Sequence, residues 1–213
     1  MATYKEIIGL NVEAKSSDPT YAVEGQVWYN TTTGALKGAA ATLSGSWASG
    51  GNLNTGRENT QGTGIKTAAL CFGGVPTPRA VTEQYDGTSW TEVNDLNTGR
   101  YNATGFGTYT SALAAGGTTT ATVANAESWN GSSWTNVSTL NTGKAGAAAA
   151  GADNTSGLVF GGNAPGGVTA TTESWNGSSF SEANDLNTAR STLAGDGIIT
   201  AALGFGGNPV TGK

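Results

Sequence analysis

The chain has 213 residues, enough for one domain with a sizeable core, and only 12% of them are Asp, Glu, Lys or Arg, giving a net charge of −5. This sparse, slightly acidic charge excludes the phosphate-neutralising surface that nucleic-acid binding requires. The sequence contains no histidine, which removes His-based catalytic triads and the usual zinc and copper sites. We therefore expect no cofactor, no metal site and no enzymatic activity.

The single cysteine and the N-terminus bear on where the protein is found. Cys71 has no cysteine to pair with in this chain, and its place in an apolar run predicts a buried, small hydrophobic residue. Residues 1–6 show no basic region leading into an apolar stretch, so we expect no signal peptide. No stretch approaches the ~18 apolar residues of a membrane span. These features favour a protein made in a cytoplasm, without a membrane span.

Residues 1–35 differ in composition from the rest and predict an N-terminal arm. Residues 7–12 favour one strand and 16–20 a turn. Residues 24–30 favour a strand that a tight turn joins to a returning strand at 35–37. The segment at 25–37, Gly-Gln-Val-Trp-Tyr-Asn-Thr-Thr-Thr-Gly-Ala-Leu-Lys, resembles short motifs in tail-fibre-like and other structural proteins of bacteriophages. The resemblance implies a virion protein; the alternative is an ordinary β-hairpin that caps the rest of the fold.

From residue 36 onward the sequence repeats. A late aromatic residue recurs in steps of 43, 44 and 46, and a Gly-Gly pair recurs in steps of 43, 45 and 45. Two independent markers with one period indicate internal repeats of roughly 40–50 residues. The recurring positions are the aromatics Trp47, Trp90, Trp134 and Phe180 and the cations Arg57, Arg100, Lys144 and Arg190.

Each repeat predicts four strands. The first is built from small residues (58–64, 101–107, 145–152 and 191–197), which suit a crowded axis. The alanine run in the third copy would favour a helix by propensity, but the repeat aligns it with Gly-rich and Thr-rich segments. The second strand is apolar on both faces (68–72, 112–115, 158–160 and 201–205), as expected between neighbouring sheets. The third and fourth form a hairpin around Asp86-Gly87, Asn130-Gly131 and Asn176-Gly177, because Asx-Gly is a strong hairpin signal.

The pattern Tyr85-Asp86, Trp90, Leu96 and Arg100, followed by an apolar strand and Gly-Gly, resembles the kelch repeat. The resemblance covers about residues 46–207. It departs from the family at Trp129 and Trp175, which replace the tyrosine, at Phe180, which replaces the tryptophan, and at Lys144, which replaces the arginine. It implies an all-β fold, a β-propeller of four-stranded blades. Galactose-oxidase-like enzymes share that propeller, but their copper site needs histidine, so that activity is excluded here.

The two ends of the repeat region predict how the ring closes. Only six residues follow Gly206-Gly207, so the C-terminal part supplies two inner strands without an outer hairpin. Residues 36–49 carry an outer pair without inner strands. Joining the halves would hide open edges and give four blades. We therefore expect an arm at 1–35 and a four-bladed propeller at 36–213, closed by strands from both termini. In the alternative, the halves pair between subunits.

Two sets of residues are candidates for special roles. Glu83, Glu127 and Glu173 recur once per repeat together with the cations, which favours structural ion pairs or hydrogen bonds between blades over a catalytic pair. The loops after the Gly-Gly pairs vary in sequence and are candidates for binding, although they are equally explained as plain connections. The candidate binding positions are Pro76, Thr77, Pro78, Arg79, Thr118, Thr119, Thr120, Asn163 and Val168.

These features favour a non-enzymatic bacteriophage virion protein: a tail-fibre, tail-associated or surface-decorating structural protein. The expected partners are other virion proteins, through the arm, and a glycan or protein of the host surface, with the chain forming a homo-oligomer in the assembly. The alternative is a non-viral kelch-like module that binds glycans or proteins. A propeller fold supports many functions, so the fold alone does not decide between them.

Overall fold

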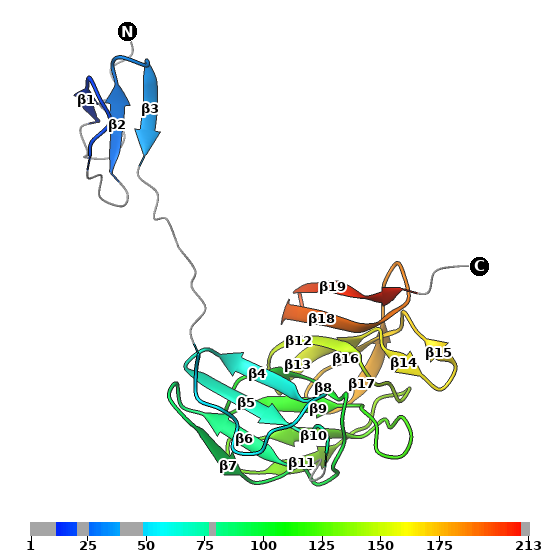
Figure 1. Cartoon of the computed structure of the whole chain (residues 1–213). Coiled ribbons are helices and arrows are strands. Elements are labelled where there is room, and N and C mark those ends of the chain that lie inside the picture. Colours follow the sequence, from blue (N-terminus) through cyan, green and yellow to red (C-terminus); the bar gives the residue numbers. More distant parts are fainter. Residues whose placement is uncertain (1–11, 21–25, 39–48, 77–79, 210–213) are drawn as a thin grey trace. The chain divides into compact units, whose positions relative to one another are not determined.

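The computed structural model describes residues 12–20, 26–38, 49–76 and 80–209, and all the regular secondary structure in these ranges is β-strand (Figure 1). The chain divides into two compact units, residues 1–49 and residues 50–213. Each unit is described by itself below.

The described part of the first unit is a three-stranded sheet. Its strands are β1 (Glu13–Lys15), β2 (Val27–Asn30) and β3 (Ala35–Gly38); β1 runs parallel to β2, and β2 pairs antiparallel with β3. The predicted hairpin at 24–37 is confirmed within its described part. The predicted strand at 7–12 lies outside the described residues, apart from Val12, which is not in a strand. The predicted boundary between residues 35 and 36 falls inside β3, so the returning strand belongs to the arm.

One carboxylate organises the first unit. Asp18 accepts hydrogen bonds from Lys37 Nζ (2.6 Å), Asn30 Nδ2 (2.8 Å) and Trp28 Nε1 (3.1 Å). These bonds, that of Lys37 first among them, lower the pKa of Asp18 from 3.8 to about 2. The Trp28 side chain is buried against this network. Polar contacts around a single acid therefore join β2, β3 and the turn at Asp18.

The described part of the second unit contains three four-stranded antiparallel sheets and two two-stranded sheets (Figure 1). In each, strands neighbour one another in chain order. Sheet I is β4 (Gln61–Ile65), β5 (Ala68–Phe72), β6 (Thr82–Tyr85) and β7 (Trp90–Val93). Sheet II is β8 (Thr104–Gly107), β9 (Ala112–Ala115), β10 (Ala126–Trp129) and β11 (Trp134–Val137). Sheet III is β12 (Ala148–Asp153), β13 (Ser156–Phe160), β16 (Thr172–Trp175) and β17 (Phe180–Ala183). Sheet IV is β18 (Arg190–Ile198) and β19 (Ala201–Pro209), and β14 (Asn163–Ala164) with β15 (Gly167–Val168) forms a small hairpin inside the third repeat.

The strands predicted for each repeat are confirmed, with one shift. The alanine-rich segment is a strand, β12, and the Asx-Gly hairpins join the third and fourth strands of sheets I to III. The first strands of sheets I to III begin about three residues later than predicted. The residues before them instead make isolated bridges, such as Tyr101 with Thr118. The Gly-Gly pairs end the second strands of sheets I to III, whereas Gly206-Gly207 lies inside β19 of sheet IV. Both glycines of each pair have positive φ, where L-residues are strained.

Consecutive sheets are linked by a chain of backbone hydrogen bonds near the start of their first strands. The linked residues, one per repeat, are Asn59, Asn102, Gly146 and Thr192, and all four have φ between 51° and 60°. Each N–H donates to the carbonyl of the previous member, at 3.0, 2.9 and 2.7 Å along the chain. Within the described residues no fourth bond joins Thr192 back to Asn59. Asparagine and glycine tolerate this backbone conformation, whereas a β-branched threonine is strained in it.

Aromatic rings packed on glycines join neighbouring sheets. A Cβ added at Gly105 of β8 would lie 2.7 Å from Cζ of Phe72 on sheet I. One added at Gly195 of β18 would lie 2.7 Å from Cζ of Phe160 on sheet III. Real Cβ atoms do not approach so closely, so these rings need glycine beneath them. The first strands are therefore small partly because they receive a ring from the preceding sheet.

The four first strands lie side by side: β4 contacts β8, β8 contacts β12 and β12 contacts β18. A cavity of about 190 Å³ is lined by residues of all four, mostly glycine and alanine, with Asp196 contributing a carboxylate. The second strands are buried in sheets I and II, where Leu70 and Leu113 have no exposed surface. Their counterpart on β19, Leu203, is 63% exposed, because no described sheet packs on β19 as sheet II packs on Leu70.

Candidate functional site

The recurring glutamates form a repeated carboxylate clamp, which we define on sheet II. Glu127 lies on the third strand, β10, paired with Ala114 of β9 and Asn136 of β11. Its Oε2 accepts the backbone N–H of Asn97 at 2.7 Å, and its Oε1 accepts the backbone N–H of Thr98 at 3.2 Å. The Oε1 atom also accepts a hydrogen bond from Nη1 of Arg100. One carboxylate thus binds two backbone amides and a cation.

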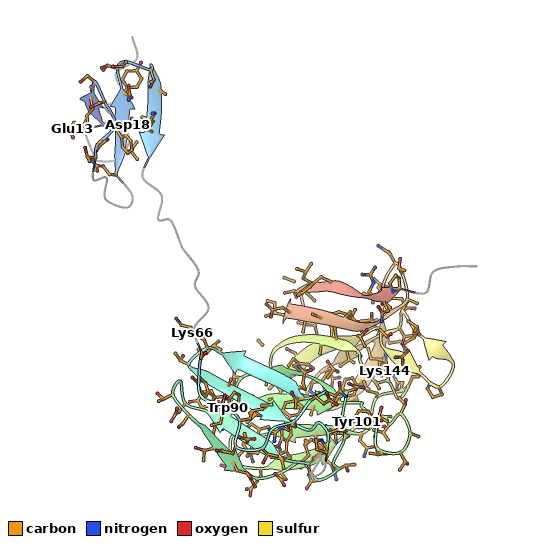
Figure 2. All side chains as sticks on the ribbon, in the orientation of Figure 1. Glu13, Asp18, Lys66, Trp90, Tyr101 and Lys144 are labelled. Atoms are coloured by element: carbon orange, nitrogen blue, oxygen red, sulfur yellow. The ribbon has the colours of Figure 1, made fainter. Side chains whose placement is uncertain are left out.

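The clamp repeats on sheets I and III. Glu83 accepts from the amides of Asn54 (2.6 Å) and Thr55 (3.3 Å), with Arg57 Nη1 at 3.0 Å from its Oε1. In the third copy, Glu173 accepts from the amides of Asn141 (2.6 Å) and Thr142 (3.3 Å), and Lys144 Nζ lies 3.2 Å from its Oε1. Figure 2 labels Lys144. The cation can therefore be arginine or lysine.

The predicted ion pairs are present, but they do not join two sheets. Each clamp ties the connection that enters a sheet to the third strand of that same sheet. The side chains of all three pairs have no exposed surface. A buried carboxylate that already binds two amides and a cation is firmly committed to these partners. We therefore assign the clamps a structural role.

The fourth set of clamp donors is present without a glutamate. Leu186 N–H donates to Ala170 O at 3.0 Å, as Leu96 and Leu140 do to the corresponding carbonyls, so the entering connection is held in the same way. Arg190 Nη1 donates to Gly206 O at 2.9 Å and has no acidic partner among the described residues. The amides of Asn187 and Thr188 likewise have no acceptor there.

A cavity of about 190 Å³ lies at these donors. It is lined by Leu186, Asn187, Thr188, Arg190, Leu193 and Gly204. In the other three repeats, the third-strand glutamate binds the corresponding amides and cation.

The recurring aromatics pack in pairs across the outer hairpins. Trp90 lies on Tyr85, Trp134 on Trp129 and Phe180 on Trp175, with ring centroids 5.0, 5.3 and 4.8 Å apart. Trp134 also donates its indole N–H to Thr82 Oγ1 of sheet I at 3.0 Å, which joins two sheets. Such aromatic pairs stabilise a fold beyond the area that they bury. Trp47 lies outside the described residues.

The predicted binding loops are placed after the second strands, as expected. Pro76 is exposed, and Thr77, Pro78 and Arg79 lie outside the described residues. Thr118 bridges both Tyr101 and Thr122, and Thr119 and Thr120 follow it in the same loop. Asn163 pairs with Val168 in the β14–β15 hairpin. The cavities at the first strands and at Arg190 are lined by other residues.

A groove on the outer part of sheet I is a site that sequence reasoning missed. It has a volume of about 420 Å³ and is lined by Gln84, Tyr85, Asp86 and Thr91 of the outer hairpin and by Tyr109 of sheet II. Tyr109 is 38% exposed. Backbone hydrogen bonds from Ser89 and Thr88 lower the pKa of Asp86, so this acid is held as a carboxylate.

The sequence does carry a signal for this groove. In the turn between the first and second strands, the second repeat has the aromatic residue Tyr109. At the same position the other repeats have Lys66, Asn154 and Ile199. Between sheets II and III, Asn154 occupies that position and donates to Ser128 Oγ and Trp129 O, both at 2.9 Å.

Across the described ranges, no group of three or more His, Cys, Asp or Glu residues is placed to hold a metal ion. No helix in those ranges is long and apolar enough to cross a membrane. Cys71 is buried and unpaired, as predicted.

In comparisons with known proteins, no family model matches the chain, and no curated protein matches it at a significant level. The kelch and bacteriophage resemblances therefore rest on the residues named above.

Proposed function

We propose that sheets I to IV are kelch-like blades of a β-propeller. Three observations support this arrangement. All four first strands line one cavity, and backbone hydrogen bonds link them in sequence. Phe205 is 50% exposed on sheet IV, while Gly62 of sheet I, the counterpart of Gly105, has no ring packed on it. In a closed ring, Phe205 would cover Gly62 as Phe72 covers Gly105.

The source of the outer strands of the fourth blade stays a prediction. Residues 39–48, which carry most of the expected outer pair, lie outside the described residues. Leu36 belongs to β3, where it pairs with Tyr29. A crosslink between residues 39–49 and β19 within one chain would support closure by both termini, and a crosslink only between different chains would contradict it.

We further propose that the protein is a non-enzymatic structural protein of a bacteriophage virion, with the first unit as attachment arm and the second exposed to the host surface. The observation that carries this proposal is the first unit itself. The phage-like segment at 25–37 contributes both strands of a hairpin, which forms a compact unit around Asp18. A separate folded arm suits attachment to other virion proteins, and the repeated sheets suit a rigid exposed scaffold.

Mass spectrometry of purified phage particles from the source tests this proposal first. We expect the protein in particles. Trp28→Ala should then abolish incorporation, because the indole of Trp28 is buried in the arm and bonded to Asp18, while the second unit stays folded. Glu13→Gln, on an exposed residue of β1, is the matched control. Particles that lack the protein, or that incorporate the Trp28→Ala variant normally, would contradict the proposal.

The alternative is a glycan-binding module, which the groove at Tyr85 and Tyr109 favours. Tyrosine rings offer apolar faces to sugar rings, and the amide of Gln84 can hydrogen-bond hydroxyl groups. Glycan-array binding that is lost in Tyr109→Ala and kept in Lys66→Gln would support this function. Replacing residues 76–79 by Gly-Ser tests the predicted loop: unchanged binding with intact folding would remove Pro76 to Arg79 from the site.

A further inference from the structure

Sheet IV presents an open edge next to a group of donors that can bind a carboxylate. Among the strands that the structure describes, β19 pairs only with β18, and all nine of its residues are exposed. Leu203 and Phe205, whose counterparts Leu70 and Phe72 are fully buried in sheet I, are 63% and 50% exposed. Beside this edge lie the amides of Asn187 and Thr188 and the guanidinium of Arg190, around the cavity described above.

The other three sheets show what fits such an edge. In each, an antiparallel third strand pairs with the second strand and places one glutamate on the two amides and the cation. The same molecule therefore contains three filled copies of the site. The ligand of a fourth copy is defined by their shared chemistry: a β-strand that carries a carboxylate at the third-strand position and continues into an aromatic-rich hairpin.

The chain's own predicted outer pair does not carry this acid. The glutamate stands seven residues before the late aromatic in every filled copy: Glu83 before Trp90, Glu127 before Trp134 and Glu173 before Phe180. Seven residues before Trp47 the sequence has Ala40. Strand addition by residues 39–48 would therefore leave Arg190 without a carboxylate. Arg190 is half-buried at the open edge, and a strand added there would bury it further without a charge partner, which is unfavourable.

We propose that β19 is a docking edge for a β-hairpin of a partner polypeptide, whose inner strand carries a glutamate that binds Arg190 and the amides of Asn187 and Thr188. The main chain of the partner pairs with β19. This is recognition by strand addition, in which backbone hydrogen bonds supply affinity and one side-chain site supplies specificity. The inference rests on the second unit alone and goes beyond the proposed virion role.

A peptide taken from the protein itself provides the probe. Residues 124–138 include the β10–β11 hairpin with Glu127. We expect this peptide, labelled with a fluorophore, to bind the full chain in an anisotropy titration. The Glu127→Gln peptide should bind at least about tenfold more weakly, because the charge-assisted hydrogen bond to Arg190 is lost. Hydrogen exchange should show new protection on β19 with the first peptide.

Variants of the protein complete the test. Arg190→Gln should weaken binding of the Glu127 peptide by a similar factor. The Glu127 and Glu127→Gln peptides should then bind this variant with similar affinity. Lys66→Gln, which removes an exposed cation at the β4–β5 turn, should bind as the unchanged protein does. Circular dichroism checks that Arg190→Gln is folded; if it is not, the comparison of the two peptides on the unchanged protein still decides.

Three results would overturn the proposal: no binding of the Glu127 peptide, equal binding of both peptides, or protection outside β19. Tighter binding by a peptide of residues 36–49 than by the Glu127 peptide would also count against it, and would favour closure by the chain's own segment.

Discussion

Glu127→Gln tests the view that the carboxylate clamps hold the sheets together. The change removes the negative charge and keeps the shape of the side chain. Arg100 then stays fully buried without a counter-charge. Its Nε and Nη2 atoms have no hydrogen-bond partner among the described residues even in the unchanged protein. The backbone N–H groups of Asn97 and Thr98 each donate to the carboxylate. The NH2 group of glutamine, itself a donor, would face one of them in place of an accepting oxygen.

The expected loss follows from these contacts. Breaking a buried ion pair by removing one partner costs about 3–5 kcal/mol. The carbonyl of glutamine can still accept one of the two amide hydrogen bonds, so we expect a loss near the lower end, about 3–4 kcal/mol. With a urea m-value of about 2 kcal/mol/M, the unfolding midpoint should fall by about 1.5–2 M.

Urea unfolding followed by tryptophan fluorescence measures this midpoint. Glu92→Gln, on an exposed residue of β7, is the matched control and should change it by less than about 0.3 M. The double variant Glu127→Gln with Arg100→Met should lose less stability than Glu127→Gln alone, because no unpaired charge then stays buried. A loss for Glu127→Gln no larger than that for Glu92→Gln would refute the reasoning.

Four further predictions follow from particular residues. Arg100→Lys should lower the free energy of unfolding by less than about 1 kcal/mol, because Lys144 fills the same place on sheet III; a urea midpoint that falls as far as in Glu127→Gln would contradict this. Thr192→Asn should raise that free energy by about 1 kcal/mol, because its φ of 53° strains a β-branched residue; a lower midpoint would contradict it.

Removing residues 1–38 should leave a cooperative calorimetric transition of the second unit, and its loss would show that the arm belongs to that core. Because the pKa of Asp18 is lowered to about 2, its contribution to the first unit is complete above pH 3.8 and is lost as the pH falls toward 2. The chemical shift of the Trp28 indole N–H should change with pH along this titration. In the Asp18→Asn variant it should stay constant over the same pH range.

The strands and hairpins could be predicted from the sequence, because their signals are local and repeat. Asp86-Gly87 and its counterparts mark the hairpins, and the regular Gly-Gly pairs outweighed the helix propensity of the alanine run at β12. The clamps were predicted as charge pairs, but not within a single sheet. The partner of Glu127 depends on the path of the connection at Asn97 and Thr98, for which the sequence pattern offers no signal.

The groove and the ring–glycine contacts could not be predicted, because they depend on how sheets face one another. Phe72 and Gly105 stand 33 residues apart, and no local pattern marks them as neighbours. Tyr109 is distinctive in the repeat alignment, but its exposure depends on the packing of sheet II beside the outer hairpin of sheet I. The closure of the ring could not be predicted either. The repeat pattern marks residues 36–49 as an outer strand pair like the others, although Ala40 stands where the other repeats have glutamate.

The placement of both clamp charges inside one repeat has a consequence for how such a protein can grow or shrink by duplication. A segment from the loop at Asn97 to the end of β11 carries the cation Arg100 and its own counter-ion, Glu127. Gaining or losing a whole segment of this phase leaves the buried charge balanced. A gain or loss that is not a whole repeat would instead leave one of the two charges without its partner. Selection against unpaired buried charge would thus favour the gain or loss of whole repeats, which would keep the repeats in phase.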